Sequence, residues 1–383
     1  MDQSTAVELL KSQLRINTTN PPGNEAEAAT ALQKVFEHAG IPAKLLPYGD
    51  GRAQLEATLT GGPGPTLAFT GHLDVVPVGD QPWQHSPFAA EEADGRIYGR
   101  GASDMKSGLV AMVCAMIALK EQGVPLQGTL KLLATVGEET SSIGAKWLVE
   151  QGFAETLDAV LIGEPTGNDI SIAEKGCLWL RITTYGKTGH GSTPAYGINA
   201  NEHMIALLAK FQSEFTFDYE PDELLSEPTS SIDVLHGGHG TNVIPDQCTV
   251  EIDMRTLPSQ KHADIISQIQ SMIDALHQDI PNFKADVTVL NDMLPMKTDA
   301  NDAFVQQLVD VVGRVCGTSP VPYGFAGYTD GAYFSKAKTG APIAVVGPGT
   351  PRVAHQPDEY VEKKDFFNSI EIYKKIACQF LKP

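Results

Sequence analysis

The sequence predicts an α/β protein in which a mostly parallel, doubly wound sheet carries an inserted ferredoxin-like domain. Strand-like and helical segments alternate over residues 1–176 and again from residue 299, which favours a parallel sheet covered by helices. Between them, residues 177–291 have the β-α-β-β-α-β succession of the split βαβ unit. We therefore expect residues 1–176 and 292–383 to form one domain, with residues 177–291 inserted as a second.

Each element of the first part follows from apolar periodicity and from the residues that interrupt it. Apolar residues at helical spacing predict helices over residues 4–14 and 25–40, which the Asn-Pro-Pro-Gly run at residues 20–23 separates. The apolar runs that predict strands are residues 53–59, 66–72, 129–136 and 157–162. Further helices are expected over residues 106–122 and 142–151.

The inserted domain and the end of the chain are assigned in the same way. The expected strands of the insertion are residues 177–185, 230–236, 248–255 and 284–290, and its expected helices are residues 199–211 and 263–276. After it come a helix at residues 303–315, a helical stretch at 331–338, a strand at 342–346 and a closing helix at 364–381. These last segments should complete the sheet that the first part begins.

Size, charge and cysteine content narrow the class of protein. A chain of 383 residues exceeds what one hydrophobic core usually covers, which agrees with two domains. The chain has 28 basic and 47 acidic side chains and no long Lys/Arg run, so we expect neither nucleic acid nor a membrane as partner. The five cysteines form no C-x-x-C pair, and we find no signal-peptide pattern and no apolar run of ~18 residues. We therefore expect a cytoplasmic enzyme with buried thiols.

Residues that can bind metal stand at the expected carboxyl ends of strands. They are His72, Glu138, Glu139, Glu164 and, after a Gly/Pro loop, His355. Asp104 is added at the start of the helix over residues 106–122, and ligands of open α/β sheets bind beyond this edge. Two imidazoles and this many carboxylates in one desolvated cleft would shift each other's pKa unless a cation lies between them. The pattern therefore predicts a metal site.

The number of donors predicts a pair of divalent ions. One bridging carboxylate can hold two such ions about 3.5–4 Å apart. Asp104 suits the bridge because its side chain is short and follows the Gly-rich run at residues 99–101. Each ion then takes one histidine and one further glutamate. Mixed nitrogen and oxygen donors favour Zn²⁺, with Co²⁺ or Mn²⁺ as substitutes.

Two more carboxylates are expected to be catalytic. Asp74 lies two residues after His72 and points the same way on a strand, so we expect it to accept the second ring N–H of that histidine. Glu138 and Glu139 are adjacent, so one can bind metal while the other takes a proton from the attacking water.

From about residue 65 to residue 360, these residues and their order resemble the co-catalytic zinc amidohydrolases, a family of acyl-amino-acid deacylases and peptidases. The resemblance implies two Zn²⁺ ions per subunit and Glu138 as the general base. Its ligand sets are His72, Asp104 and Glu164 for one ion, and Asp104, Glu139 and His355 for the other.

The insertion also resembles this family. The run at residues 186–194 is similar to the motif whose histidine, here His190, reaches from the partner subunit and stabilises the oxyanion. In other hydrolases one such donor is worth about 2.7–4 kcal/mol. Asn242 and Arg255 lie in segments that resemble substrate contacts of the family, and Arg255 is suited to bind a carboxylate through two parallel hydrogen bonds. The resemblance implies a homodimer formed through this domain.

The expected reaction is hydrolysis of the amide bond of an N-acyl amino acid. Residues 327–331 resemble the Gly-Thr-Ser-Asp-Gly loop of the family's desuccinylases, so N-succinyl-LL-2,6-diaminopimelate is the expected substrate and Thr329 an expected contact. Tyr328 replaces a small hydroxyl residue of that loop, and Ala332 stands where an arginine is typical. Deacetylation of N-acetylornithine and dipeptidase or carboxypeptidase activity therefore remain alternatives.

A metal-binding scaffold without catalysis is the alternative from another class. Binding needs only the ligands, whereas catalysis also needs the carboxylate of Glu138, so this residue favours an enzyme. The chain lacks the G-x-G-x-x-G, G-x-x-x-x-G-K-[ST] and G-x-S-x-G patterns. Their absence argues against the common nucleotide-binding and serine-hydrolase sites.

Overall fold

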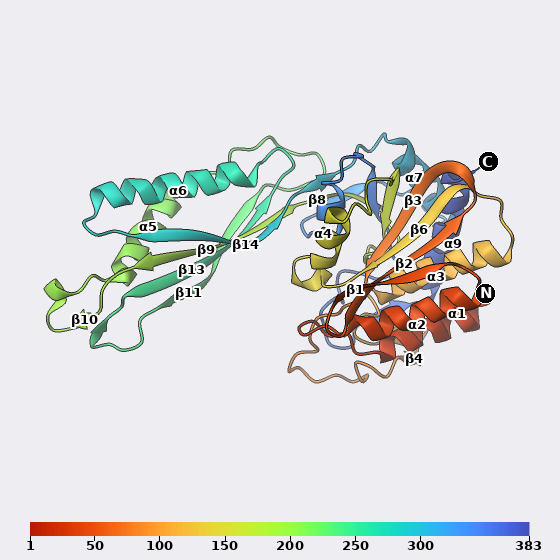
Figure 1. Ribbon diagram of the computed structural model, residues 1–383, viewed down its shortest axis with the longest axis horizontal. Coiled ribbons are helices and arrows are strands. Elements are labelled where there is room, and N and C mark those ends of the chain that lie inside the picture. The colour runs from red at the N-terminus through yellow and green to blue at the C-terminus, as the bar shows by residue number, and fades with distance from the viewer. Residues whose placement is uncertain (383) are drawn as a thin grey trace. The chain divides into compact units, whose positions relative to one another are not determined.

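The computed structural model describes residues 1–382, which divide into two compact units (Figure 1). Unit 1 comprises Met1–Ala173, Lys297–Gly324 and the chain from Thr329 onward, and unit 2 comprises Glu174–Met296 with Phe325–Tyr328. Residues 177–291, the expected insertion, all lie in unit 2. Unit 2 also includes residues 325–328, a segment that no sequence pattern assigns to it.

Unit 1 is built around a mixed β-sheet of nine strands within the described residues. The strand order is β1 (Ala43–Gly49), β2 (Arg52–Thr60), β6 (Gln127–Thr135), β3 (Gly62–His72), β7 (Ala159–Ile162), β17 (Ile343–Val345), β8 (Ser171–Glu174) and β15 (Met296–Lys297), with β16 (Tyr323–Phe325) paired to β8. The central strands β6, β3, β7 and β17 are parallel to one another. β1 and β2 pair antiparallel on one side, and β8 pairs antiparallel with β17 on the other. The sheet expected to be mostly parallel is therefore parallel only at its centre.

The antiparallel pair β1–β2 has a local cause. The two strands are joined by the tight turn Asp50-Gly51, which reverses the chain, and Gly51 adopts a φ of +69° that favours glycine. Pro47 interrupts the apolar pattern of β1, so the pattern does not predict this strand. The proline is tolerated because β1 is an edge strand. A strand at the edge pairs on one side only, so the N–H that proline lacks is not needed for a second neighbour.

Helices bury the central strands of unit 1. α3 (Lys106–Glu121) packs on β3 and β6 and against α1 (Gln3–Arg15) and α9 (Lys363–Phe380), while α2 (Glu25–His38) packs on β1 and β2. Every residue of α3 from Lys106 to Leu119 is buried, which explains its nearly continuous apolar sequence. Other helices of unit 1 are η1 (Glu138–Thr140), α4 (Ile143–Glu150), α7 (Ala303–Cys316) and α8 (Gly331–Phe334). α8 is shorter than the helical stretch expected at residues 331–338.

A small antiparallel sheet in unit 1 joins a segment shortly before the last helix to residues 91–98. It contains β4 (Glu91–Ala93), β5 (Arg96–Tyr98) and β18 (Tyr360–Glu362). In its register Tyr360 lies opposite Tyr98, and Val361 lies opposite Ile97. Strands of three residues are too short for periodicity to predict them. They nevertheless place the segment before Tyr360 beside the segment after Tyr98.

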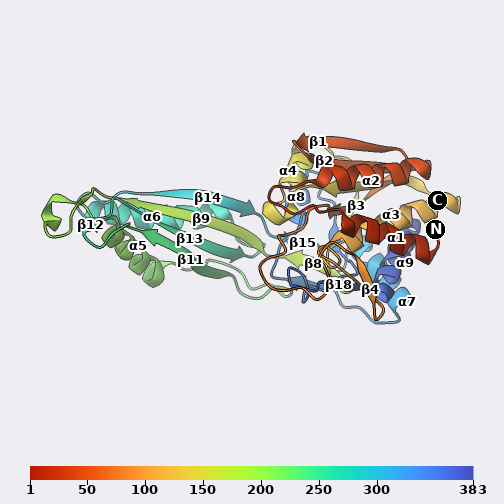
Figure 2. The same ribbon diagram turned by 90° about the horizontal axis from the view of Figure 1, so that it is seen from below.

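Unit 2 consists of a four-stranded antiparallel sheet and the two helices that pack on it. Its main elements in chain order are β9 (Gly176–Tyr185), α5 (Ala200–Glu214), β11 (Thr229–Gly237), β13 (Gln247–Thr256), α6 (His262–Asp279) and β14 (Ala285–Met293). Figure 2 shows the strands side by side in the order β11-β13-β9-β14. The chain order matches the β-α-β-β-α-β succession that the sequence predicts. A separate short ladder joins β10 (Gly189–His190) to β12 (Val243–Ile244), and η2 (Pro194–Tyr196) follows β10 in the chain.

One-sided burial fixes the strands of unit 2. Alternate residues of β13 are buried, among them Val250 and Ile252, and they join a core with Leu180 of β9, Leu207 of α5 and Ile269 of α6. A slip of one residue would turn this apolar set toward solvent, so the pattern determines the register.

Two further features concern the whole of residues 1–382. None of the helices in this range combines the length and the apolar character needed to cross a membrane. All five cysteine thiols in this range are free.

The buried amine of Lys106 ties α3 to the end of α1. Its Nζ donates to the carbonyl oxygens of Gln13 (3.0 Å) and Ile16 (2.8 Å), and burial lowers the pKa of Lys106 to about 7. Lys106→Met should leave both carbonyls without this donor and lower the free energy of unfolding in urea by about 1–3 kcal/mol. Lys120→Met, at an exposed position of the same helix, should change it by less than about 0.5 kcal/mol. Equal stability of the two variants would contradict this role of Lys106.

Candidate metal centre

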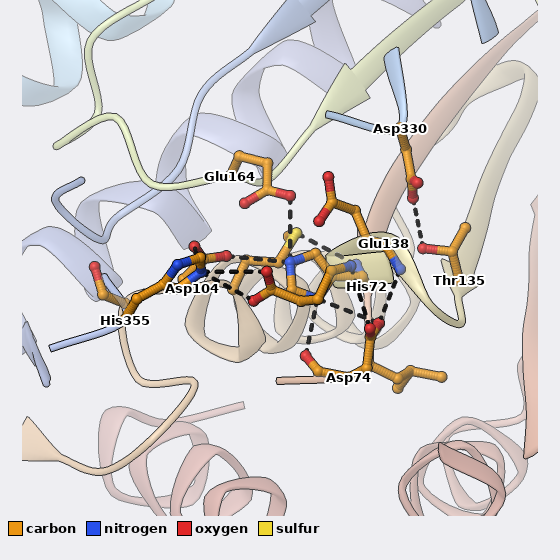
Figure 3. Close-up of polar contacts among 12 residues, drawn as sticks. His72, Asp74, Asp104, Thr135, Glu138, Glu164, Asp330 and His355 are labelled. Atoms are coloured by element: carbon orange, nitrogen blue, oxygen red, sulfur yellow. Dashed lines mark hydrogen bonds and ion pairs between the residues drawn. The ribbon is translucent and has the colours of Figure 1, made fainter. Parts of the chain in front are cut away.

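Five side chains with metal-binding atoms meet at the carboxyl edge of the parallel strands in unit 1 (Figure 3). His72 is the last residue of β3, Glu139 lies in η1 just after β6, and Glu164 follows β7. His355 lies in the loop between β17 and β18, and Asp104 lies in the loop before α3. The structure thus brings together all five residues that the sequence predicts as ligands.

Close packing of two main-chain segments brings Asp104 toward Glu164. A Cβ atom on Gly108 would lie 1.9 Å from the carbonyl oxygen of Gly163, so only glycine lets the start of α3 approach the end of β7 this closely. The carboxylates of Asp104 and Glu164, which flank this contact, both reach the ring of His72.

The five side chains form two donor groups that share Asp104. In the first group, His72 Nε2 lies 3.1 Å from Asp104 Oδ1 and 3.3 Å from Glu164 Oε1. In the second group, His355 Nε2 lies 3.3 Å from Asp104 Oδ2 and 3.2 Å from the carboxylate oxygens of Glu139. Within each group all donor atoms lie within 4.8 Å of one another. These are the two ligand sets that the family resemblance implies.

The charges of the cluster strongly perturb its titration. Burial would lower the pKa of His72, but the carboxylates of Glu164 and Asp104 raise it well above the ordinary value. Burial would raise the pKa of Asp104, but its contacts with His355 and His72 hold that pKa far below the usual range. Contacts with Asp104 and Glu139 raise the pKa of His355 to about 10. Burial raises the pKa of Glu164 to about 8. Without a cation, protons must balance these carboxylates.

The donor set fits two divalent cations. Each group offers one imidazole nitrogen together with carboxylate oxygens, a combination that Zn²⁺ and other first-row ions accept. A cation in each group would stabilise ionised carboxylates and neutral imidazoles, and so take the place of the protons. Asp104 directs one oxygen toward each histidine, so its carboxylate is able to bridge two ions.

The ring of His72 is oriented by a main-chain carbonyl. His72 Nδ1 lies 2.9 Å from the backbone oxygen of Asp74, whereas the nearer carboxylate oxygen of Asp74 is 3.6 Å away. An N–H on Nδ1 therefore donates to the backbone oxygen, and in the neutral ring the Nε2 lone pair would face the donor group. The expectation that the Asp74 carboxylate accepts this N–H is corrected, because the carbonyl is the closer acceptor.

The carboxylate of Asp74 instead holds the segment that carries the two glutamates. It accepts the backbone N–H of Glu138 at 3.2 Å and that of Glu139 at 3.3 Å, and it accepts the amide of Asn20 at 2.9 Å. The same Asn20 amide nitrogen lies 2.9 Å from the hydroxyl oxygen of Thr140. Asn20 is a supporting residue that sequence reasoning missed, because its Asn-Pro-Pro-Gly run has the composition of a chain break.

Glu138 is a buried carboxylate that belongs to neither donor group. Figure 3 shows it beside His72. Burial raises the pKa of Glu138 well above the usual range, and the charges of Glu164 and Glu139 add to this effect. A carboxylate that is next to the ligands but not among them is free to exchange protons with a substrate or with water.

The loop of Thr329 is close-packed. Thr329 is buried, and its hydroxyl oxygen accepts the backbone N–H of Gly331 at 3.0 Å at the start of α8. Next to it, Asp330 accepts a hydrogen bond of 2.6 Å from the hydroxyl of Thr135, and burial raises the pKa of Asp330 to about 6. In unit 1 this loop therefore joins α8 to the end of β6.

The other predicted substrate contacts lie in unit 2. His190 is exposed on β10, and its Nδ1 accepts the backbone N–H of Ser192 at 3.1 Å. Asn242 lies just before β12, where its main-chain carbonyl oxygen accepts the main-chain N–H of Gly191 at 2.8 Å. The β10–β12 ladder therefore brings His190 and Asn242 into one neighbourhood of unit 2.

Arg255 is placed differently from the expectation. It lies near the end of β13, away from the β10–β12 ladder, and its Nε and Nη2 donate to the two carboxylate oxygens of Asp253 at 2.8 and 2.9 Å. The pair of parallel hydrogen bonds expected for a substrate carboxylate is made within the chain. The cause is strand geometry, because residues two apart on a strand share one face.

Proteins of known sequence and structure resemble this chain over almost all of its length. Residues 68–379 match the sequence profile of Peptidase family M20/M25/M40. A probable succinyl-diaminopimelate desuccinylase of Staphylococcus aureus (strain N315) is 32% identical over 98% of this chain and 97% of its own. An acetylornithine deacetylase of Aliivibrio fischeri is 30% identical over 96% of this chain and 95% of its own. The solved structure of an M20 family metallo-carboxypeptidase from Sulfolobus solfataricus has the same fold, with a TM-score of 0.81 at 22% identity and 99% coverage of both chains.

Metal binding should release protons from this cluster. In the cation-free protein the pKa of His355 is about 10 and that of Glu164 is about 8, so at neutral pH both groups hold protons that a cation must displace. The affinity for Zn²⁺ should therefore increase when the pH is raised from about 6 to about 8. Titration calorimetry in two buffers of different ionisation enthalpy measures the number of protons released. A heat of binding that is independent of the buffer would contradict the expectation.

Proposed function

Since this chain belongs to peptidase family M20/M25/M40, we propose that it hydrolyses the amide bond of an N-acyl amino acid. It is a metal-dependent hydrolase. The proposed substrate is N-succinyl-LL-2,6-diaminopimelate, which would give succinate and LL-2,6-diaminopimelate. The observation that carries the proposal is Asp104, whose two carboxylate oxygens face two separate histidines beside the uncommitted carboxylate of Glu138.

Two Zn²⁺ ions are the proposed cofactors, with Co²⁺ or Mn²⁺ as substitutes. The residues that would hold them are His72, Asp104 and Glu164 for one ion, and Asp104, Glu139 and His355 for the other. Cations at such a pair of sites polarise a carbonyl oxygen and lower the pKa of water. The buried side chains around them provide the low-dielectric surroundings in which this effect is strong.

Glu138 is the proposed general base. In the reaction the oxygen of water bonds to the amide carbon, and Glu138 accepts the proton that the water gives up. Glu138 then passes this proton to the amide nitrogen as the C–N bond breaks, which leaves an amine and a carboxylic acid, and the acid gives its proton to the solvent. The position of Glu138 supports this role, because its buried carboxylate lies beside His72 and belongs to neither donor group. Asp74 would support the step by fixing the backbone of Glu138.

We propose that the protein acts as a homodimer formed through unit 2, in which His190 of each subunit serves the site of the other. β11 is an edge strand whose main-chain groups can pair with a second copy. Leu235 on β11 and Ile205 on α5 are 55% and 66% exposed, which supports an apolar contact there.

We also propose a cytoplasmic location for the protein. The five free thiols support it, because thiols stay reduced in that compartment.

Deacetylation of N-acetylornithine is the second candidate function. Ala332 is buried and apolar at the position where a desuccinylase-like loop is expected to carry arginine. Arg255, the other expected carboxylate ligand, bonds Asp253. A succinyl group needs a cation for its free carboxylate, whereas an acetyl group does not, so these two positions favour the smaller acyl group.

Turnover of the zinc-loaded protein on a set of substrates distinguishes the candidates. N-succinyl-LL-2,6-diaminopimelate should give the highest kcat/KM, above N-acetylornithine and above a panel of dipeptides. Release of free amine measures all three reactions in the same way. Absence of hydrolysis of the succinyl substrate together with turnover of N-acetylornithine would replace the first proposal by the second.

Glu138→Gln should separate catalysis from metal binding. The variant keeps the size of the side chain but cannot accept the proton, so kcat should fall by about 10²–10⁴-fold while both cations still bind. Glu139→Gln, one residue further, is the matched control and should weaken the binding of one cation instead. Unchanged kcat in Glu138→Gln would show that the base is another group. Wild-type protein that binds both cations but hydrolyses none of the substrates would favour the metal-binding scaffold.

A further inference from the structure

The two donor groups differ in how their histidine is supported. His72 ends a central strand and is fully buried, whereas the side chain of His355 is 50% exposed. His355 lies in a loop and has a φ of +63°, outside the regular conformations of helix and strand. The distance between His355 and Asp104 therefore depends on the contacts that join their two loops.

Glu359 is the side chain that makes the most direct of these contacts. It lies four residues after His355 and is fully buried. Its Oε1 accepts the backbone N–H groups of Ser103 at 2.8 Å and of Asp104 at 3.0 Å. Its Oε2 accepts Nη1 of Arg100 at 2.7 Å. One carboxylate thus holds the main chain of Asp104 against the segment that carries His355.

Arg100 completes the contact from the opposite loop. Its Nη1 also donates to the carbonyl oxygen of Gln356 at 3.2 Å, and its Nη2 donates to that of His355 at 3.4 Å. The guanidinium carbon lies 5.0 Å from the ring centre of Trp83. Arg100 and Glu359 are both buried, so each compensates the charge of the other.

A second, uncharged contact joins the same two loops. The hydroxyl of Ser103 donates to the carbonyl oxygen of Thr350 at 2.9 Å and accepts the N–H of Thr350 at 2.8 Å. A Cβ atom on Gly349 would lie 2.3 Å from the carbonyl oxygen of Ser103, so the main chains touch here. This Ser103–Thr350 contact acts on the Asp104 loop without a buried charge.

We propose that Glu359 is a positioning residue that sets the affinity of the second metal site, the group of Asp104, Glu139 and His355. The inference rests on the proposed two-metal function. The first group should depend on Glu359 much less, because His72 ends β3 and Glu164 follows β7, and these strands pair in parallel from Leu67–Ala159 to Thr70–Ile162. Without Glu359, the loop that carries Asp104 can separate from the loop that carries His355. The carboxylate of Asp104 then stays close to His72 and Glu164, which the strands hold in place.

Three variants make this selective effect measurable. Glu359→Gln keeps the shape of the side chain and removes the charge that binds Arg100. Ser103→Ala weakens the same junction through the uncharged contact, so it tests the proposal even where Glu359→Gln does not fold. Glu362→Gln is the matched control, since it removes a carboxylate three residues away that pairs with Arg96 at 2.7 Å and is partly exposed. Far-UV circular dichroism reports whether each variant is folded.

Calorimetric titration of the cation-free, full-length protein with Zn²⁺ resolves the two sites. Wild type and Glu362→Gln should bind two ions per chain. Glu359→Gln should bind the first ion with nearly unchanged affinity and the second about 10–100-fold more weakly, and Ser103→Ala should show the same selectivity with a smaller change. Equal weakening of both sites, or no weakening of the second site in a folded variant, would overturn the role of Glu359. Wild-type protein that binds fewer than two ions would instead overturn the two-metal function on which the inference rests.

Discussion

Carboxylates and imidazoles that share a buried cleft need protons or cations between them, and in this protein that requirement is concentrated at Asp104. Its two oxygens contact two histidines that belong to different parts of the chain. Each contact stabilises the charged form of its partners only while the geometry is kept. The ends of three parallel strands, the loop before α3 and the loop before β18 must all arrive at this one side chain.

The supports of the centre follow from this demand. Two carboxylates outside the donor groups hold main-chain N–H groups instead, and these hydrogen bonds tie down the segments that carry the donors. Asp74 holds the backbone of Glu138 and Glu139, and Glu359 holds the backbone of Asp104. Each such bond has a charged acceptor and is therefore stronger than a bond between neutral groups. The same residue type thus appears in two roles, as a possible ligand and as a clamp on the main chain.

The part of the site that sequence can predict is the part that follows from local pattern. An apolar run marks a strand, and parallel strands end at one edge, so the sequence alone suffices to place His72, Glu139 and Glu164 together. Arg255 shows the limit of this reasoning. Its pairing with Asp253 obeys the two-residue periodicity of a strand, but periodicity does not say whether an arginine bonds a neighbour or a substrate. At Asp74, the backbone oxygen and not the carboxylate is the nearer acceptor for the ring of His72. The two distances differ by less than 1 Å, and periodicity cannot resolve such a difference.

The features that sequence could not predict are those in which distant segments meet. Asn20 reaches Thr140 across 120 residues, and Glu359 reaches Asp104 across 255 residues. The strands that make the second contact possible have three residues each and carry no periodic signal. The sequence also did not predict that the sheet is mixed. Pro47 interrupts the apolar run of the edge strand β1, so a search for apolar runs does not find this strand.

The separation of 255 residues between Asp104 and Glu359 has a consequence for biogenesis. A ribosome adds about 5–20 residues per second, so the interval between the synthesis of these two residues is on the order of ten to fifty seconds. For most of that time, from the addition of Glu164 onward, the nascent chain carries every donor of the centre except His355. The residues of the first donor group are therefore all present long before His355 is synthesised, whereas the second group is incomplete until that residue is added.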